Sequence, residues 1–574
     1  MNKRNHLSRF FTVRTTIILL SILVLSILSA ASLVSAGPEK AESPALVRIE
    51  INGRSDIEKL AAAGLSIYAQ LYTPQGKLYL LASVDALQAH ELRRAGYSLR
   101  VLDPDSRDAS YYLLYGLPTE LSQVENYISL LDVEGRQAVA RLAPEDVPNV
   151  SEAGIMYTPL VLHPLVVPRA ETAPSLPASI TPNPLVQNMV DQVDSDKLFY
   201  FVGGLSGEWS VLVNDSPYLI STRYTYATVP IKRATRYTYE FFQSIGLPTG
   251  YDTYWLGELE KRSVIAEQAG ITQPERIFLL IAHLDSTSQA PYDLAPGADD
   301  NASSSSGLMA IAEILSQYNF GCTLRYVLFT GEEQGFYGSR DYAANVHSVG
   351  DNIEAVLNLD MLGYNTPGTS PTIELHTRPD NQNDLSIANL LAESIAAYEI
   401  NLNPLILQDG KSFSDHSSFW EYGYPAIMAI EDWSDHTPHY HKSSDQLETL
   451  NMLYYTEFVK AAIATFAHMG CLLQAELSGT IVDATSGNPL HGAAVQATLD
   501  DGSRWSTNTL ADGTYHLTLV PGNYQVWAGA PFYLSQTSAE IAIANDQSVS
   551  QDFLLQSNPD AFAVYLPVLA SEAR

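Results

Sequence analysis

Short apolar runs alternate with helix-like stretches between residues 185 and 473. Each run is continuous and of strand length, as expected for a strand that is buried on both faces. Helical patterns separate the runs, and a last helix is expected over residues 451–470. This alternation predicts an α/β domain, with a mixed β-sheet sandwiched between helices. The four runs occupy residues 276–286, 324–333, 354–362 and 425–432.

The preceding region contains two related halves. Residues 76–103 and 135–163 each show a short apolar strand, a helical stretch that ends in Ala-Gly, and a second apolar strand. A strand–helix–strand unit used twice predicts a small duplicated α+β domain over residues 37–163. Two interpretations stay open. The domain is either a prodomain that assists folding or inhibits the rest of the chain, or an unrelated accessory domain.

The remaining segments differ in composition. Residues 164–184 are rich in proline and polar residues, which predicts a linker and a processing site. Residues 476–556 show short alternating strands with Gly, Asp and Asn turns every eight to ten residues, which predicts an all-β sandwich. Residues 557–574 are assigned to a C-terminal tail.

The N-terminus has the pattern of a secretory signal. A basic segment, an apolar run and small residues before Ala36 predict a signal peptide over residues 1–36 and a secreted, extracellular protein. The alternative is an uncleaved anchor, because the apolar run is nearly long enough to cross a bilayer. Membrane contact is expected only in that case. The two cysteines, Cys322 and Cys471, are either one disulfide or two buried thiols.

The chain is strongly acidic. Its 64 acidic and 32 basic residues give a formal net charge of −32. Binding to nucleic acid or to an anionic membrane requires a basic surface, so both classes of partner are disfavoured. The charge identifies no partner and leaves the oligomeric state open.

Polar side chains end three of the predicted buried strands. His283 and Asp285 close the first, the adjacent Glu332 and Glu333 follow the second, and Asp360 closes the third. In open α/β sheets, ligand sites form at the carboxyl ends of strands. These side chains are therefore expected to meet in one crevice.

Two loops add further candidate ligands. Residues 296–307 carry Asp299 and Asp300 into a helix start, and residues 431–447 carry three histidines, His436, His439 and His441. Imidazole and carboxylate groups without thiolate suit zinc or another first-row divalent ion. The number of carboxylates is high for one zinc ion but suits two ions that share a bridging carboxylate.

Five motifs in chain order carry a family resemblance. They are H-x-D-S, G-A-D-D-N-A-S, G-E-E-x-G-x-x-G-S, N-L-D-M-x-G-Y and P-x-Y-H-x-S-x-D, between residues 283 and 445. Over residues 185–473 the sequence resembles the M28 metallopeptidases, the co-catalytic zinc aminopeptidases. The segments G-x-(I/V), G-x-P-L-x-G-A-x-V and T-x-x-D-G-x-Y in residues 476–556 resemble the carboxypeptidase regulatory-like, transthyretin-like module.

The resemblance implies a role for each candidate residue. It implies two zinc ions per catalytic domain, a peptide or protein substrate, and a Glu general base that activates water. Asp299 would bridge the ions and Glu332 would be the base, while Asp285 would orient His283. His441 is chosen over His439 because of its spacing to the following acid. The implied metal ligands are His283, Asp299, Glu333, Asp360 and His441.

Some positions depart from the family pattern. Ser304 stands where a glycine is usual, and Ala310 where a glutamate is common. Lys411 stands where some relatives have a tyrosine that binds the oxyanion of the reaction. It either serves that role or points into solvent. The rival functions are a carboxypeptidase or dipeptidase, a glutaminyl cyclase, or a binding protein on the same scaffold.

Overall fold

An eight-stranded mixed sheet forms the centre of the region that follows the linker. The computed structural model describes residues 43–558 apart from 178, 501 and 546, so the expected signal peptide and most of the tail lie outside the described residues. The strand order is β12-β13-β15-β14-β16-β19-β17-β18, and β15, β14, β16 and β19 run parallel. The strands are β12 (Thr249–Leu256), β13 (Leu259–Gln268), β14 (Gln273–His283), β15 (Cys322–Phe329), β16 (Ile353–Asp360), β17 (Thr372–His376), β18 (Asn403–Leu407) and β19 (Ala426–Glu431).

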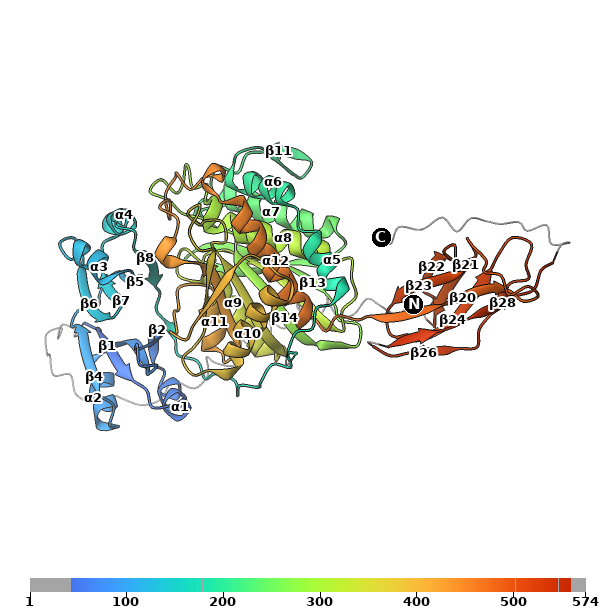
Figure 1. The fold of residues 1–574 in the computed structure, drawn as a ribbon. Helices are drawn as coiled ribbons and strands as arrows, with labels where there is room; N and C mark the ends of the chain where they lie inside the picture. The colour runs from blue at the N-terminus through green and yellow to red at the C-terminus, as the bar shows by residue number, and fades with distance from the viewer. Residues whose placement is uncertain (1–42, 178, 501, 546, 559–574) are drawn as a thin grey trace, which may run out of the picture. The chain divides into compact units, whose positions relative to one another are not determined.

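Helices cover both faces of this sheet (Figure 1). Successive residues of a strand point to opposite faces. In β14, Phe278 and Leu280 therefore join the larger apolar core, while Leu279 and Ile281 pack on the other side. The predicted sheet between helices is confirmed. The helices on the larger core are α5 (Pro184–Asp191), α6 (Ser195–Ser206), α7 (Thr228–Ser244), α8 (Ser304–Leu315), α10 (Gln382–Ala397) and α12 (Met452–Met469), and those on the other face are α9 (Tyr337–Val349) and α11 (His416–Glu421).

The two cysteines form a disulfide. Cys322 begins β15 and Cys471 follows α12, and their sulfur atoms are 2.06 Å apart. The bridge therefore fixes the last helix to the central sheet. Of the two alternatives open from the sequence, the structure has the bridged one.

The N-terminal region consists of two repeats with the same order, β-α-β-β-α-β. This is the ferredoxin-like unit, and it is larger than the strand–helix–strand unit recognised in the sequence. The strand orders are β4-β1-β3-β2 and β6-β7-β5-β8, and β9 (His163–Pro164) joins the first sheet beside β2. The first repeat is β1 (Ala45–Glu50), α1 (Arg54–Ala62), β2 (Ser66–Tyr72), β3 (Leu78–Val84), α2 (Ala86–Arg94) and β4 (Leu99–Asp103); the second is β5 (Tyr111–Tyr115), α3 (Pro118–Val124), β6 (Ser129–Glu134), β7 (Gln137–Arg141), α4 (Val147–Glu152) and β8 (Met156–Leu160).

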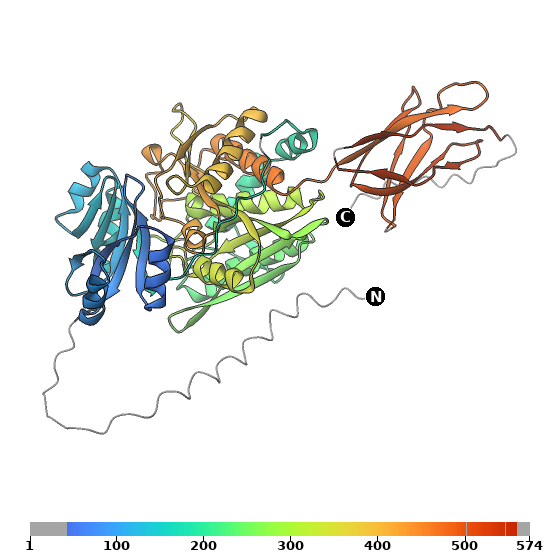
Figure 2. The same cartoon turned by 90° about the horizontal axis from the view of Figure 1, so that it is seen from below.

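The last region is all-β, as the turn spacing predicted. The described residues from 475 to 555 form strands without a helix, drawn in orange to red (Figure 2). Two sheets share one apolar core, which includes Leu477, Val495 and Phe553. Strands β20 (Ala475–Asp483), β23 (Thr514–Leu519), β27 (Ser548–Ser550) and β28 (Phe553–Leu555) form one sheet, and β21 (Ala494–Leu499), β22 (Arg504–Asn508), β24 (Gly522–Gly529), β25 (Gln536–Thr537) and β26 (Ile541–Ile543) form the other.

The described residues from 44 onward belong to one compact unit. Within the described part of the chain, no helix is both long enough and apolar enough to cross a lipid bilayer.

Candidate active site

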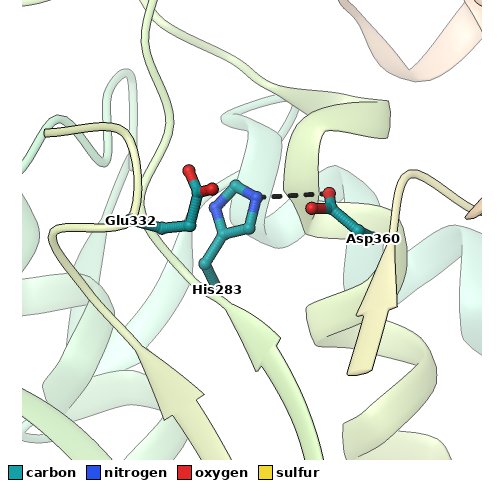
Figure 3. A group of neighbouring side chains, drawn as sticks. All are labelled: His283, Glu332 and Asp360. Carbon is teal, nitrogen blue, oxygen red and sulfur yellow. Dashed lines mark hydrogen bonds and ion pairs between the residues drawn. The ribbon is translucent and has the colours of Figure 1, made fainter. Parts of the chain in front are cut away.

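The ends of three parallel strands bring a histidine and two carboxylates together. His283 is the last residue of β14, Asp360 is the last of β16, and Glu332 lies three residues beyond β15. All three are buried, and their ligand atoms lie within 4.8 Å of one another. Figure 3 shows the two carboxylates on either side of the imidazole, with His283 Nε2 3.3 Å from Asp360 Oδ1. The expected convergence at the carboxyl ends of the strands is therefore present.

A second group overlaps the first through His283. The ligand atoms of His283, Asp300 and Glu333 also lie within 4.8 Å of one another. Nε2 of His441 is 3.0 Å from Asp300 Oδ2 and 2.9 Å from Glu333 Oε2. Asp300 Oδ1 is 3.3 Å from Nε2 of His283. The two oxygens of Asp300 thus face the two histidines.

The prediction of Asp299 as the shared ligand does not agree with this arrangement. Oδ1 of Asp299 accepts hydrogen bonds from the backbone N–H of Gly363 at 2.7 Å and from the hydroxyl of Ser303 at 3.3 Å. Burial raises the pKa of Asp299 to about 7. The adjacent residue, Asp300, takes the place between the histidines. Two neighbouring carboxylates look alike in the sequence, and only the backbone path of the loop distinguishes them.

Asp445 holds this loop in position. Its two carboxylate oxygens each accept one backbone N–H, from Asp299 and from Asp300, at 3.0 Å. Asp445 is fully buried, and burial raises its pKa well above the usual range, with the Asp299 carboxylate adding to the shift. Sequence reasoning used Asp445 as the acid that follows His441 but gave it no role. The H-K-S-S-D spacing of residues 441–445 was the available signal.

His283 is oriented by the backbone rather than by the side chain expected. Its Nδ1–H donates to the backbone carbonyl of Asp285 at 3.1 Å, whereas the nearest carboxylate oxygen of Asp285 is 3.8 Å away. That carboxylate instead accepts from the hydroxyl of Thr225 at 2.8 Å and from the N–H of Glu332 at 3.4 Å. Asp285 therefore also helps to position Glu332. The proposed catalytic role of its carboxylate on His283 is not supported by this geometry.

The three late histidines have different surroundings. His441 alone among them reaches the carboxylates of the described site. His436 stacks on Trp433, with ring centroids 3.9 Å apart, and the Nδ1 of His439 is 2.9 Å from the hydroxyl of Ser444. The choice of His441 over His439 agrees with this placement.

The charges of the site are unbalanced. The two groups hold four carboxylates and one imidazole, and His441 contacts the second group, in a buried volume where like charges repel strongly. Burial raises the pKa of Glu332 well above the usual range, with Glu333 and Asp415 adding to the shift. Burial alone would lower the pKa of His283, but the carboxylates of Glu332 and Asp360 raise it well above its usual value.

These residues fit divalent metal ions. Because Nδ1 of His283 donates to a carbonyl, its Nε2 is the ring atom that faces the oxygens of Asp300 and Asp360. A cation must lie between Nε2 and these oxygens: a proton, in agreement with the raised pKa of His283, or a metal ion in its place. Among the described side chains, Oε1 of Glu333 and Nδ1 of His441 have no hydrogen-bond partner. Imidazole and carboxylate ligands without sulfur suit zinc.

Lys411 lies in the interior, not in solvent. Its side chain is 1% exposed, and its Nζ has no hydrogen-bond partner among the described residues. The ammonium is 3.8 Å from Glu374 and 4.1 Å from the ring centroid of Tyr115. Burial lowers the pKa of Lys411. The interpretation of an exposed lysine is therefore wrong.

Comparison with known proteins finds two family models that match parts of this chain. The family model "Peptidase family M28" matches residues 263–466, and "Carboxypeptidase regulatory-like domain" matches residues 476–556. Residues 263–466 are thus similar in sequence to peptidase family M28. The matched M28 segment contains His283, Asp300, Glu332, Glu333, Asp360 and His441.

Curated relatives share the same part of the chain. A "Probable leucine aminopeptidase" of Arthroderma benhamiae is 30% identical over 205 residues, which are 34% of this chain and 54% of the relative. A "Probable zinc metalloprotease" of Leptosphaeria maculans is 29% identical over 227 residues, 34% of this chain and 52% of the relative. The chain thus spans about half the length of these curated relatives.

The solved structures that match this chain include an aminopeptidase and a glutaminyl cyclase. The LapA aminopeptidase of Legionella pneumophila is 19% identical, with a TM-score of 0.49, over 63% of this chain and 99% of that chain. A glutaminyl cyclase of Porphyromonas gingivalis is 19% identical, with a TM-score of 0.39, over 48% of this chain and 97% of that chain.

Proposed function

We propose that the chain is a secreted zinc aminopeptidase, which removes N-terminal residues from peptides or proteins. The observation that carries this proposal is the position of Asp300, whose two oxygens face His283 and His441. A carboxylate shared in this way supports two zinc ions. His283, Asp300 and Asp360 would hold one ion, and Asp300, Glu333 and His441 the other.

Zinc supplies Lewis-acid polarisation of a carbonyl oxygen and lowers the pKa of water. Glu332 is the carboxylate left outside both sets of ligands. Its backbone N–H points to Asp285, and its side chain lies beside His283. We assign Glu332 as the general base, which accepts the proton of the attacking water and passes it to the leaving amine. A base at this position contributes about 100- to 10,000-fold to the rate.

The cellular location is part of the proposal. The basic, apolar and small-residue segments of residues 1–36 support export. The disulfide between Cys322 and Cys471 agrees with an oxidising compartment. The strongly acidic composition suits a soluble extracellular protein.

A panel of aminoacyl anilides tests this function in the full-length protein after zinc loading. Parallel reactions use N-acetylated anilides, peptides with a C-terminal reporter and peptides with N-terminal glutamine. We expect turnover of free-amine anilides only, lost on chelation and restored by zinc. Release confined to C-terminal residues would identify a carboxypeptidase, and cyclisation of glutamine a cyclase. Bound zinc without any turnover, also after a cut in the linker, would favour a binding protein.

A further inference from the structure

Strand β8 of the N-terminal region lies against the candidate active site. The chamber that contains both metal-binding groups is closed on one side by residues 156–159. The ring of Tyr157 meets the ring of His441 edge to face, with centroids 4.7 Å apart. A segment about 280 residues away in the sequence therefore contacts a proposed metal ligand directly.

Hydrogen bonds fix this strand to the loop that carries His441. The hydroxyl of Ser151 donates to the backbone carbonyl of Tyr440 at 3.0 Å. In return, the hydroxyl of Tyr440 donates to the backbone carbonyl of Tyr157 at 3.4 Å. Ser151 lies in α4 and Tyr157 in β8, so the two bonds tie the last helix and the last strand of the second repeat to Tyr440, the neighbour of His441.

The chamber behind β8 is too small for a substrate residue. Its cavity volume is about 20 Å³. By this measure one water needs about 10–15 Å³, so the chamber holds roughly a single water. A separate outer groove of about 470 Å³ is lined by Tyr157, Glu333 and His441 among others. An amino-acid residue does not fit in the inner chamber that all the proposed ligands share.

A wide apolar contact holds the N-terminal region in place. The faces of its two sheets that carry no helices share one buried cluster with side chains around the site. From the N-terminal region the cluster includes Tyr111, Leu113 and Met156, and from the M28 region Met361, Phe413, Met428, Ile430, Trp433 and Tyr440. Met361 directly follows the proposed ligand Asp360. The apolar wall of the active site is thus covered by the N-terminal sheets.

The same contact covers the buried lysine. The ring of Tyr115 lies 4.1 Å from the ammonium of Lys411 and 5.6 Å from the ring of Phe413. No hydrogen bond to this ammonium forms within the described chain. Covering a charge without hydrogen bonds costs free energy, which the cation–π contact with Tyr115 offsets in part. The contact therefore combines buried apolar side chains with a buried charge.

We propose that residues 44–165 form an inhibitory domain that blocks the active site with β8. This inference rests on the function proposed above, since a block matters only if the site acts on a substrate. It selects the inhibitory prodomain among the interpretations left open by the sequence. If the site is free in about one molecule in a hundred, the apparent activity falls by about 100-fold.

The test uses the full chain with a site-specific protease sequence inserted after Ala173. Thr172 and Ala173 are exposed, and the insertion lies in the linker, outside the contacts of β8. Intact and cut proteins are compared over a dilution series. A tethered domain has a high effective concentration that dilution does not change, whereas a cut domain dissociates on dilution.

Two readouts are measured on each sample. The first is kcat/KM for a free-amine aminoacyl anilide. The second is hydroxyl-radical oxidation of Met361, Phe413 and Tyr440. These side chains are nearly inaccessible in the closed form, in which residues 44–165 cover the site. We expect the cut, diluted protein to gain about 100-fold in kcat/KM and to become oxidised at these residues, while the intact chain does neither.

Matched tyrosine variants of the cut protein probe the block itself. Tyr157→Ala removes the ring that contacts His441, so the cut N-terminal domain should dissociate at a higher protein concentration. Tyr127→Ala changes an exposed tyrosine of the same domain, 62% exposed, and should leave the dilution curve unchanged. An equal shift in both variants would contradict a specific role for Tyr157.

The outcomes separate this inference from the proposed function. Equal kcat/KM of the intact and the cut, diluted protein would overturn the inhibitory domain and leave the peptidase function intact. Oxidation that appears on cutting without turnover in either form would retain the covering domain and overturn the peptidase function. Unchanged oxidation after cutting and dilution, with no gain in activity, would overturn the inference as well.

Discussion

Asp299 and Asp300 are adjacent in the chain, but their carboxylates have different partners. Oδ1 of Asp299 accepts the N–H of Gly363, whereas the oxygens of Asp300 lie 3.3 Å from His283 and 3.0 Å from His441. Asp445 holds both backbone amides and so fixes which carboxylate faces which way. One residue of the pair is therefore placed to bind metal, and its neighbour to support the loop.

Exchange of each aspartate for asparagine distinguishes these roles. Asp300→Asn replaces one oxygen between the histidines with an amide group that donates hydrogen bonds. Zinc affinity should therefore fall by at least about 100-fold, which is more than the usual fall when a residue that only supports a ligand is changed. Asp299→Asn should keep near-normal zinc content. Metal analysis after dialysis and titration with a zinc indicator measure both. Equal zinc loss in the two variants would restore Asp299 as a ligand candidate.

Glu332→Gln should separate catalysis from metal binding. The amide cannot accept a proton, so kcat should fall by about 100- to 10,000-fold, while zinc content stays the same. Glu333→Gln is the matched control one residue away, because it should lose zinc and activity together. Both are measured on the cut protein in which the site is accessible. If Glu332→Gln also loses zinc, Glu332 is a ligand and the assignment of the base is wrong.

The sequence allowed the strand-end residues to be predicted because their positions follow from local rules. Buried parallel strands appear as continuous apolar runs, and their carboxyl ends meet at one edge, so His283, Glu332, Glu333 and Asp360 could be named in advance. The bridging residue could not, because Asp299 and Asp300 differ only in the path of the backbone. That path depends on Asp445, which is 145 residues further along.

The contact of β8 with the candidate site also could not be predicted from short segments of the sequence. The strand–helix–strand pattern over residues 76–103 and 135–163 showed a repeat but gave only the second half of each β-α-β-β-α-β unit. Tyr157 looks like an ordinary strand residue in the sequence. Its contact with His441 depends on how two complete sheets pack, and no short window of sequence contains that information.

Removal of the disulfide should destabilise the central domain. Cys322 and Cys471 are 149 residues apart, and closing a loop of that length in the unfolded chain corresponds to roughly 5 kcal/mol in the chain-entropy treatment. The double variant Cys322→Ala/Cys471→Ala should therefore unfold at a clearly lower urea concentration. Zinc content in native buffer should stay normal, since the bridge lies at the opposite end of β15 from Glu332. An unchanged midpoint would show that α12 is held by packing alone.

Acid should destabilise the packing of residues 44–165 over the site, because protonation of His163 is unfavourable in that closed form. This side chain is 16% exposed, and its Nε2 is 3.5 Å from the carboxylate of Glu421 in α11. Burial lowers the pKa of His163 to about 4, aided by the charge of Arg340 and opposed by Glu421. An exposed histidine has a pKa of about 6.5. Between these values the unfolded or open state binds more protons, so stability is present above pH 6.5 and is lost as the pH falls towards 4.

The size of this effect follows from the difference between the two pKa values. A pKa that falls from about 6.5 in the open state to about 4 in the folded state corresponds to a loss of roughly 3 kcal/mol in stability once the pH is below 4. Oxidation of Met361 in the intact chain, followed from pH 7.5 to pH 4.5, should rise as the pH falls. His163→Gln should flatten the profile, because glutamine does not titrate, while His90→Gln, at an exposed position of the same domain, should not. Equal profiles for all three proteins would show that the acid response, if present, arises at other buried histidines such as His416, whose pKa burial lowers to about 3.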